Sequence, residues 1–351
     1  MERHVERGLD APSETDGRYR IEDIARRAGV SISTVSRVLN GRPDVAPRTR
    51  ARVQAVIDEL GYVPDASARD LAGGGGRSIA LLFPEEFSGL TQLELGFFVG
   101  AANAAAQQDT VFHLLTQQPT RGNLLRLTRG RQLQGIILMQ IRMHDWRVDL
   151  LRAQRFPLVL IGRCAENDGV AYIDLDFEAA ADVAVKHLVE LGHDAIGYLA
   201  RPGFMRESGI GSAVRSLDGF IAAADRYAVA ATYREITPSI DEAREATLSM
   251  LDEQPAVSAI VTSSGTTAVG VYQALLRKGM DVPSDASVIS ISSDRIATMA
   301  SPSLTNVDFP TDTMGYRAAE MLINAIRNPD HPPRQELLSP RLIQRESTVR
   351  R

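Results

Sequence analysis

Near the start of the chain, the apolar positions predict two short helices joined by a tight turn. Over residues 21–28 they lie three and four positions apart, which puts them on one face of a helix, and Gly29 is placed to end it. A second helix runs through residues 34–39, and the hydroxyl groups of Ser31 and Ser33 are placed to cap its start. Two short helices joined at a glycine are typical of a helix-turn-helix.

A third helix is expected to begin near Pro47, a residue favoured in the first turn, and to end at Gly61. The first two helices should pack through one small core. That core joins Ile24, Ala25 and Ala28 of the first helix to Val35 and Val38 of the second. Small residues at Ala25 and Gly29 should let these helices approach closely. The amino-terminal half of the second helix then stays free to enter a major groove.

The exposed positions of the second helix carry groups that suit DNA recognition. Ile32 offers an apolar tip for a thymine methyl group, and Arg37 offers a guanidinium fork for guanine. Ser33 and Ser36 offer hydroxyl groups for bases or phosphates. The same periodicity would also arise in a three-helix bundle that has only a structural role.

From residue 78 onward, predicted strands and helices alternate. Apolar strand candidates occupy residues 78–83, 111–116, 135–139, 158–162, 195–199, 232–236, 259–262 and 287–291. Helical stretches occupy residues 93–107, 146–154, 178–191, 212–227, 241–252 and 267–278. Such alternation predicts an α/β fold with parallel sheets covered by helices and right-handed crossovers.

Length and composition are those of a globular protein with two or three domains. The chain has 351 residues, of which 44% are hydrophobic and 24% charged, and this excludes a disordered chain, a collagen and a coiled-coil rod. No apolar run reaches the roughly 18 residues of a membrane helix, and residues 1–17 lack the apolar stretch of a signal peptide. The single cysteine, Cys164, forms neither an intrachain disulfide nor a cysteine zinc site. We expect a cytoplasmic protein without a membrane partner.

The charge is distributed unevenly along the chain. The net charge is −5, yet nine arginines and only three acidic residues stand between Arg18 and Arg52, a local balance of +6 that leaves −11 for the rest. A basic head on an acidic body suits contact between the head and phosphates. The alternative is a solvated charged surface.

Several motifs carry a resemblance to a known family. The run from Ile21 to Asn40 contains AGVS and TVSRVLN, and ELGYVP follows at residues 59–64. Further matches are LVELGH at residues 188–193, SLT at 303–305 and LIQREST at 342–348. In this order and spacing, the motifs closely resemble the lactose-repressor/galactose-repressor (LacI/GalR) family, and the resemblance covers nearly everything after residue 18.

The resemblance implies a helix-turn-helix head on a two-lobed body like that of periplasmic binding proteins. The chain would cross between the lobes near Asp174, Thr311 and Leu338. The implied ranges are a flexible tail (1–17), the DNA-binding domain (18–64), a hinge helix with a glycine linker (65–76) and an effector-binding and dimerisation body (77–351). Lobe one would hold residues 77–174 and 311–337, and lobe two residues 175–310 and 338–351.

The resemblance also implies roles at the DNA. Base reading would fall to Ile32, Ser33 and Arg37, and phosphate contact to Ser31, Thr34, Ser36, Asn40, Arg48 and Thr49. Leu71 corresponds to the leucine that the family wedges into the minor groove to kink the site. Because so short a helix is unstable alone, the hinge should order only with DNA and a second subunit.

An effector should bind at the carboxyl ends of the strands, in the cleft between the lobes. Asp294 matches the first aspartate of a family pair after a strand, and its carboxylate would accept hydroxyl groups of a sugar-like ligand. Arg163, also after a strand, would hold a carboxylate, phosphate or hydroxyl pair. A solvated loop acid and a surface salt bridge are the respective alternatives.

Three departures from the family's sequence pattern weaken the prediction of a sugar ligand. The family has an arginine three residues before its glycine-aromatic pair, whereas this chain has Ser216 there and Arg215 one position earlier, about 100° round a helix. The pair Ser264-Gly265 replaces the family's Asn-Asp, and Phe309 replaces a common glutamine. We keep Arg215, Ser264 and Phe309 as effector candidates, but fewer polar anchors imply a changed ligand or a lost one.

These observations predict a homodimeric repressor of transcription that reads a palindromic operator at the nucleoid and responds to a small-molecule effector of unknown identity. The alternatives are a solute-binding protein of the same body fold and a sugar enzyme of similar shape. No catalytic residue, cofactor or metal site is expected. The six histidines lack HExxH spacing, residues 262–266 form no nucleophile elbow, and the glycine run at 73–76 precedes a strand instead of following one.

Overall fold

The computed structural model describes residues 21–39, 42, 44–60, 78–84, 92–129 and 133–351. The chain divides into two compact units, Met1–Gly76 and Arg77–Arg351, which are described separately. No helix within the described ranges is long and apolar enough to cross a membrane.

The smaller unit contains the three predicted helices, α1 (Ile21–Ala28), α2 (Ile32–Leu39) and α3 (Pro47–Leu60). Their apolar faces form one core. It contains Ile24, Ala25, Ala28, Val35, Val38, Val53, Val56 and Ile57. The core therefore matches the predicted one and extends it to α3.

Of the two roles expected for Gly29, ending the first helix is confirmed and allowing close approach of the helices was wrong. No atom outside its immediate neighbours lies within 4 Å of where its Cβ would be, so close packing does not require a glycine there. Its φ of +61° is in the left-handed region, which side chains disfavour, and this conformation turns the chain from α1 into α2.

The larger unit, the body, is built on two six-stranded sheets, each within its own lobe. The first sheet has the order β11-β5-β4-β3-β1-β2 and is parallel throughout. Its strands are β1 (Ser78–Leu82), β2 (Val111–Leu115), β3 (Gly135–Leu138), β4 (Leu158–Ile161), β5 (Ala171–Leu175) and β11 (Gln335–Leu338). Its helices are α5 (Gln92–Gln107), α6 (Arg121–Arg129), α7 (Trp146–Ala153) and α14 (Thr311–Arg327).

The second sheet has the order β12-β10-β9-β8-β6-β7 and is parallel except for β12, which runs antiparallel to β10. Its strands are β6 (Ala195–Ala200), β7 (Ala230–Glu235), β8 (Ala259–Thr262), β9 (Ser287–Ser292), β10 (Thr305–Asp308) and β12 (Leu342–Ile343). Its helices are α8 (Phe177–Glu190), α9 (Gly203–Glu207), α10 (Gly211–Tyr227), α11 (Ile240–Glu253), α12 (Gly265–Arg277) and α13 (Asp294–Ala297). Two mostly parallel sheets with helices on both faces confirm the predicted α/β class.

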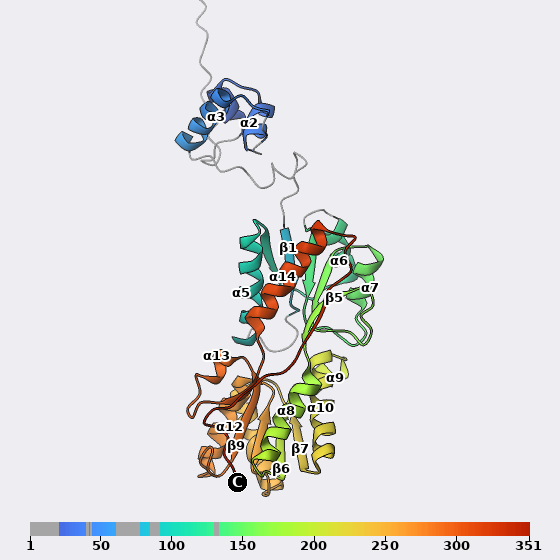
Figure 1. Cartoon of the computed structure of the whole chain (residues 1–351), viewed down its shortest axis with the longest axis vertical. Helices are drawn as coiled ribbons and strands as arrows, with labels where there is room; N and C mark the ends of the chain where they lie inside the picture. Colours follow the sequence, from blue (N-terminus) through green and yellow to red (C-terminus); the bar gives the residue numbers. More distant parts are fainter. Residues whose placement is uncertain (1–20, 40–41, 43, 61–77, 85–91, 130–132) are drawn as a thin grey trace, which may run out of the picture. The chain divides into compact units, whose positions relative to one another are not determined.

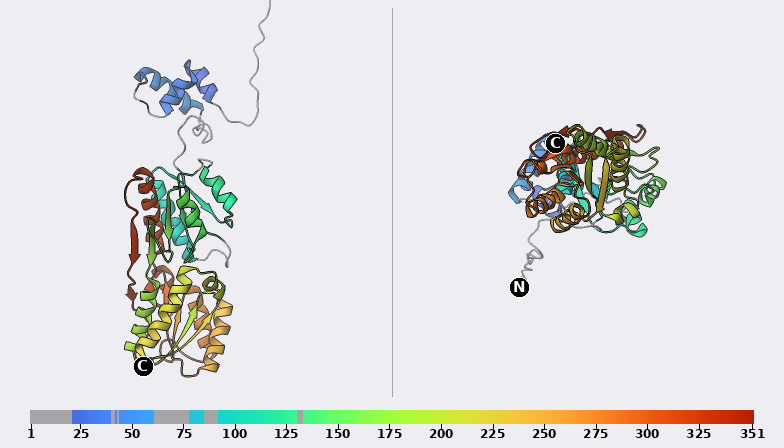
Figure 2. Two further views of the ribbon diagram at one scale, coloured as in Figure 1. Left: turned by 90° about the vertical axis from the view of Figure 1, so that its right-hand side faces the viewer. Right: turned by 90° about the horizontal axis from the view of Figure 1, so that it is seen from below.

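The chain passes between the two sheets three times. It leaves the first sheet after β5, returns to the first lobe after β10 to form α14, and leaves again between β11 and β12. Figure 2 follows the last passage, in red. The two lobes are therefore connected by three crossings of the backbone, which limit how far one lobe can move relative to the other.

Strands that the periodicity did not identify are short or partly polar. β10 has the sequence TNVD, yet Thr305 and Asn306 are fully buried because neighbouring strands and the carboxyl-terminal segment cover them. β5 and β11 were missed for the same reason, since AYIDL and QELL do not form apolar runs. Tertiary packing, and not local sequence, makes these segments strands.

Side chains of the first sheet alternate between its two faces, as a pleated strand requires. Ile79 and Leu81 face α5 and α14, whereas Ala80 and Leu82 face α6 and α7. Figure 1 shows α5 and α14 crossing the same face side by side. Both faces are thus covered, and the carboxyl edge of the sheet is left to form a site.

Glycines allow α5 and α14 to touch along their backbones. A Cβ at Gly315 would lie 2.1 Å from the carbonyl oxygen of Phe97, and a Cβ at Gly100 would lie 2.0 Å from that of Asp312. These neighbours are backbone atoms and cannot rotate away.

We therefore expect Gly315→Ala to destabilise the body by about 1–3 kcal/mol through overpacking. Gly122→Ala in α6 is the matched control, because nothing lies within 4 Å of its Cβ position, and there alanine should be neutral or stabilising by about 0.5–1 kcal/mol. Thermal unfolding of the two variants checks this, and equal midpoints would show that the helices are not held this closely.

Candidate functional site

The recognition face of the smaller unit lies on α2. Val35 and Val38 turn into the core, while the predicted base-reading residues Ile32, Ser33 and Arg37 lie on the exposed side. The Ile32 side chain is 47% exposed, and the Arg37 side chain is 62% exposed. The exposed apolar side chain of Ile32, at the start of α2, is therefore available to be buried by a binding partner.

Three hydroxyl groups cluster at the first turn of α2. Ser31 Oγ accepts the backbone N–H of Thr34 at 3.2 Å, which caps the helix, and it lies 2.8 Å from Ser33 Oγ and 2.9 Å from Thr34 Oγ1. The predicted phosphate contacts Ser31 and Thr34 are thus brought together at a helix amino terminus, where the helix dipole favours an anion.

The remaining predicted DNA contacts are spread over the smaller unit. Arg37 is 3.6 Å from Asp44, a weak exposed pair that a phosphate or base can displace. Arg48 is exposed and Thr49 half-buried in the first turn of α3, and Ser36 is half-buried on α2. Asn40 and Leu71 lie outside the described residues.

A cavity of about 70 Å³ lies between the lobes of the body, at the carboxyl ends of the strands. Its walls are mostly apolar and include four phenylalanines. Phe309 lies 5.6 Å from Phe97 and 5.3 Å from Phe177, measured between ring centroids. The polar residues in its lining are Glu94, Gln140, Arg163, Asp174, Arg201 and Ser212. The cavity fills only a fraction of the roughly 300–1,000 Å³ typical of ligand sites, so a large ligand requires the lobes to open.

Two of the five predicted effector residues, Arg163 and Phe309, line this cavity. Ser264, Asp294 and Arg215 do not belong to its lining. Ser264 caps α12 by accepting the backbone N–H of Thr267 at 3.3 Å. The Asp294 carboxylate pairs with Arg345, and its side chain is half exposed.

Arg215 spans the two lobes. Its guanidinium donates to the backbone oxygens of Arg163 and Cys164 at 3.0 and 2.9 Å, although the residue itself belongs to α10. Ser216, which stands at the position where the family has its arginine, is buried and points back at Ala213. The shift by one position therefore turns the guanidinium from the cavity to the backbone of the opposite lobe.

Backbone bonds near Arg215 also join the two lobes. The N–H of Gly211 donates to the Ile141 oxygen at 2.8 Å, and the N–H of Met143 donates to the Gly209 oxygen at 2.7 Å. Together with the Arg215 contacts, they hold the lobes at this side of the cleft in one arrangement.

Asp174 is a site residue that the sequence analysis used only to mark a crossing. It lies in β5, is nearly fully buried, and its Oδ2 is 3.5 Å from Arg163 Nε. Burial raises the pKa of Asp174 to about 7, against the opposing effect of Arg215 and Arg163. The signal that could have found it is a lone carboxylate between apolar residues immediately before a lobe crossing.

Gln140 and Arg201 were also missed, and both lie just beyond the end of a strand. Gln140 follows β3 by one residue and has a φ of +52°, a strained conformation for a residue with a side chain. The Oε1 atom of Gln140 is buried without a hydrogen-bond partner. Arg201 follows β6, and its guanidinium lies over the ring of Phe177 at 5.7 Å.

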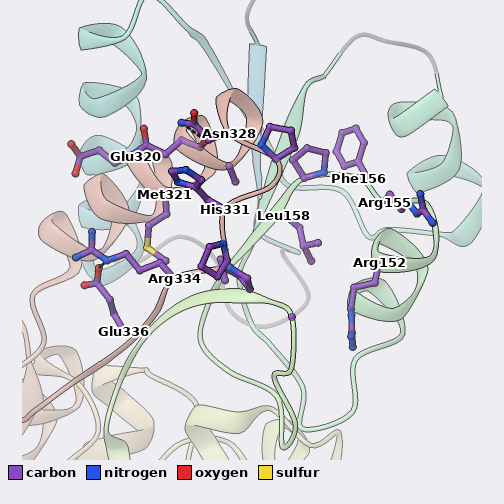
Figure 3. Close-up of a pocket in the computed structure, with 18 of the residues that line it drawn as sticks. Arg152, Arg155, Phe156, Leu158, Glu320, Met321, Asn328, His331, Arg334 and Glu336 are labelled. Carbon is purple, nitrogen blue, oxygen red and sulfur yellow. Dashed lines mark hydrogen bonds and ion pairs between the residues drawn. The ribbon is translucent and has the colours of Figure 1, made fainter.

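Another cavity, of about 900 Å³, lies at the opposite, amino-terminal edge of the first sheet (Figure 3). The end of α7 and the turn after it contribute Arg152 and Arg155, and the segment after α14 contributes Arg334. Arg334 pairs with Glu336 at 2.6 Å. None of the predicted effector residues lines this cavity. Among the described residues, no group of three or more His, Cys, Asp or Glu side chains is placed to hold a metal ion.

Comparison with known proteins bears on both units. Residues 20–65 match the family of bacterial regulatory proteins described as the lacI family, and residues 185–348 match a periplasmic binding protein-like domain. The HTH-type transcriptional regulator MalR of Streptomyces coelicolor is 32% identical over 349 residues, covering 94% of this chain and 96% of MalR.

Solved structures resemble most of the chain. A complex of the transcriptional regulator CelR with cellobiose has a TM-score of 0.66 and 27% identity, covering 94% of this chain and 100% of that one. A lac repressor dimer bound to operator and the anti-inducer ONPF has a TM-score of 0.83. Its identity is 24%, over 95% of this chain and 99% of that one, and the likeness is one of fold.

We expect Arg215→Met to destabilise the body by about 1.5–3 kcal/mol, because it removes two buried hydrogen bonds from a charged donor. Arg226→Met is the matched control: Arg226 also lies on α10, but its side chain is 61% exposed in its pair with Asp182. Chemical denaturation of the body measures both variants. An unchanged midpoint for Arg215→Met would contradict its role as a link between the lobes.

Asp174 should make stability depend on pH. Its pKa near 7 exceeds the value of about 4 in an unfolded chain, so its contribution to stability is complete below pH 4 and is lost as the pH rises through 7. Relative to Asp174→Asn, the wild type should lose up to about 4 kcal/mol over this range. Thermal unfolding of both proteins at pH 5 and pH 8 gives the difference, and a difference independent of pH would refute the assignment.

Proposed function

This chain belongs to the lacI family of bacterial regulatory proteins, and from this we propose how its parts act in regulation. It is a DNA-binding transcriptional regulator. We propose that residues 18–64 bind the operator, residues 65–76 form the hinge, and residues 77–351 bind the effector and a second subunit. The observation that carries the proposal is the exposed face of α2, with Ile32, Ser33 and Arg37 directed away from a complete core.

At the operator, we assign base reading to Ile32, Ser33 and Arg37. Phosphate contact is assigned to Ser31, Thr34, Ser36, Asn40, Arg48 and Thr49. The hydroxyl cluster at the start of α2 supports this division, since it offers donors to a phosphate at the positive end of the helix. We also propose that Leu71 is the wedge that enters the minor groove and kinks the site.

A homodimer on a palindromic operator follows from the two-fold symmetry that such sites share with their proteins. Exposed apolar side chains on two adjacent elements of the body support it. They are Leu95 and Val99 on α5 and Val111 and Leu114 on β2. Apolar groups exposed together on one lobe are available to a second subunit.

The effector site that we propose is the cavity between the lobes, with Arg163 and Phe309 in contact with the ligand. The relative CelR binds cellobiose in its solved complex, which supports a small-molecule effector. Arg215 would sense the ligand through the backbone of Arg163, and roles for Ser264 and Asp294 stay predictions. A ligand that binds one arrangement of the lobes more tightly shifts the hinge and so the operator affinity.

The proposal places the protein in the cytoplasm at the nucleoid, where its operator is, and assigns it no catalytic reaction, since a regulator of this kind acts by binding. Repression relieved by the effector is the mode that we propose.

Two substitutions test the division between base and phosphate contacts. Arg37→Ala should cost about 1–3 kcal/mol at the preferred operator and relax base choice at one position in each half-site. Arg48→Ala removes the same charge but should weaken binding to all sequences alike and lower the salt slope by about one. Selection of binding sites from random DNA, with titrations at several salt concentrations, distinguishes the two.

Two outcomes would contradict the proposal. An Arg37→Ala protein with the wild-type sequence preference would remove Arg37 from base reading. A wild-type protein that selects no sequence at low ionic strength would favour the alternatives, a solute-binding protein or a sugar enzyme.

A further inference from the structure

Arg201 is a cation in the cleft whose guanidinium donates no hydrogen bond to any residue that the structure describes. It follows β6 directly and lines the cavity between the lobes. Its guanidinium lies over the ring of Phe177, and within the described ranges it makes neither a hydrogen bond nor an ion pair. A guanidinium carries five N–H donors, and those of the half-buried Arg201 are left for solvent or for a ligand in the cavity.

The other cations of the cleft are already paired. Arg163 is 3.5 Å from Asp174 and 3.0 Å from Glu178, and Arg215 donates to two backbone oxygens and lies 4.0 Å from Glu178. Two arginines therefore share two carboxylates. Arg201 takes no part in this arrangement.

The nearest acids do not neutralise Arg201. Asp174 and Glu94 both act on it through space, but neither forms an ion pair with it. Burial lowers the pKa of Arg201 and outweighs the opposing effects of Tyr198 and of both acids. Because burial also raises the pKa of Asp174 to about 7, that carboxyl carries only part of its charge near neutral pH.

We propose that Arg201 binds the acidic group of an anionic effector, a carboxylate or a phosphate, in the cavity between the lobes. This rests on the proposed function only in taking that cavity as the effector site. A guanidinium binds either group through two parallel hydrogen bonds. A neutral sugar could not supply the opposite charge that Arg201 lacks.

The other residues that line the cavity indicate what the rest of this ligand is like. Phe97, Phe177 and Phe309 form a continuous aromatic wall that leads to Arg201. The unpartnered Oε1 of Gln140 supplies one acceptor for a hydroxyl or amide group. With about 70 Å³ of space, the site as it stands suits a compact anion with an apolar or ring-shaped part.

The first test needs no ligand. If Arg201 is kept for an anion, it lowers the stability of the free protein, so Arg201→Met should raise the melting temperature by about 2 °C or more. Arg226→Met removes the same charge from an exposed position of the same lobe and should not raise it. An Arg201→Met protein that melts below the wild type would overturn the proposal, because the arginine would then be satisfied within the protein.

The second test uses pairs of small molecules that differ in charge, on the full chain at constant ionic strength. The probes are inorganic phosphate, glycerol 3-phosphate with glycerol, glucose 6-phosphate with glucose, and gluconate. At least one anion should raise the melting temperature of the wild type while its neutral partner does not. Phosphate and carboxylate probes separate the two acid groups.

For the anion that acts, Arg201→Met should weaken binding about tenfold to hundredfold, measured by calorimetry, while Arg226→Met retains it. Equal effects of charged and neutral partners, a response that survives in Arg201→Met, or no response to any anion would each overturn the proposal. Operator binding by the wild type without ligand is measured in parallel. Its absence would count against the proposed function and would leave the assignment of Arg201 to be judged by the melting curves.

Discussion

Charged side chains buried between the lobes impose the constraint on which the body depends. Arg163, Arg215 and Asp174 meet there beside the half-exposed Glu178, and each of the first three loses water that it must replace with a partner. Arg215 achieves this by donating to the backbone of the opposite lobe. The lobes therefore cannot separate at this point without exposing unpaired groups, and a ligand that alters these contacts alters the angle between the lobes.

The smaller unit follows a simpler rule. Eight apolar side chains from three helices make a core just large enough to hold α2 with one face outward. The left-handed Gly29 sets the turn, and Ser31 satisfies the exposed start of α2. Because the core uses only Val35 and Val38 of that helix together with Leu39, the remaining positions are released for recognition.

Much of the resemblance to the family lies in residues that stabilise the second lobe. The two ring nitrogens of His193 meet the hydroxyl groups of Ser258 and Ser287 at 2.9 Å each. Ser347, near the carboxyl terminus, bonds to Val288 and Thr305 across two strands. These residues hold the second sheet together and do not line the cavity between the lobes.

Periodicity along the sequence determined most helices, the α/β class and the family, because these depend on spacings within a few residues or on contiguous motifs. It also located the face of α2, since one helix is enough to define a face. Only the tertiary structure decided what meets in the cleft. Asp174 near the end of β5, Arg201 after β6 and Arg215 on α10 come from distant segments that the order of strands brings together. Polar strands such as β10 exist only because their neighbours bury them. Whether a guanidinium is paired, as in Arg215, or unpaired, as in Arg201, depends on atoms of the other lobe, which no local pattern specifies.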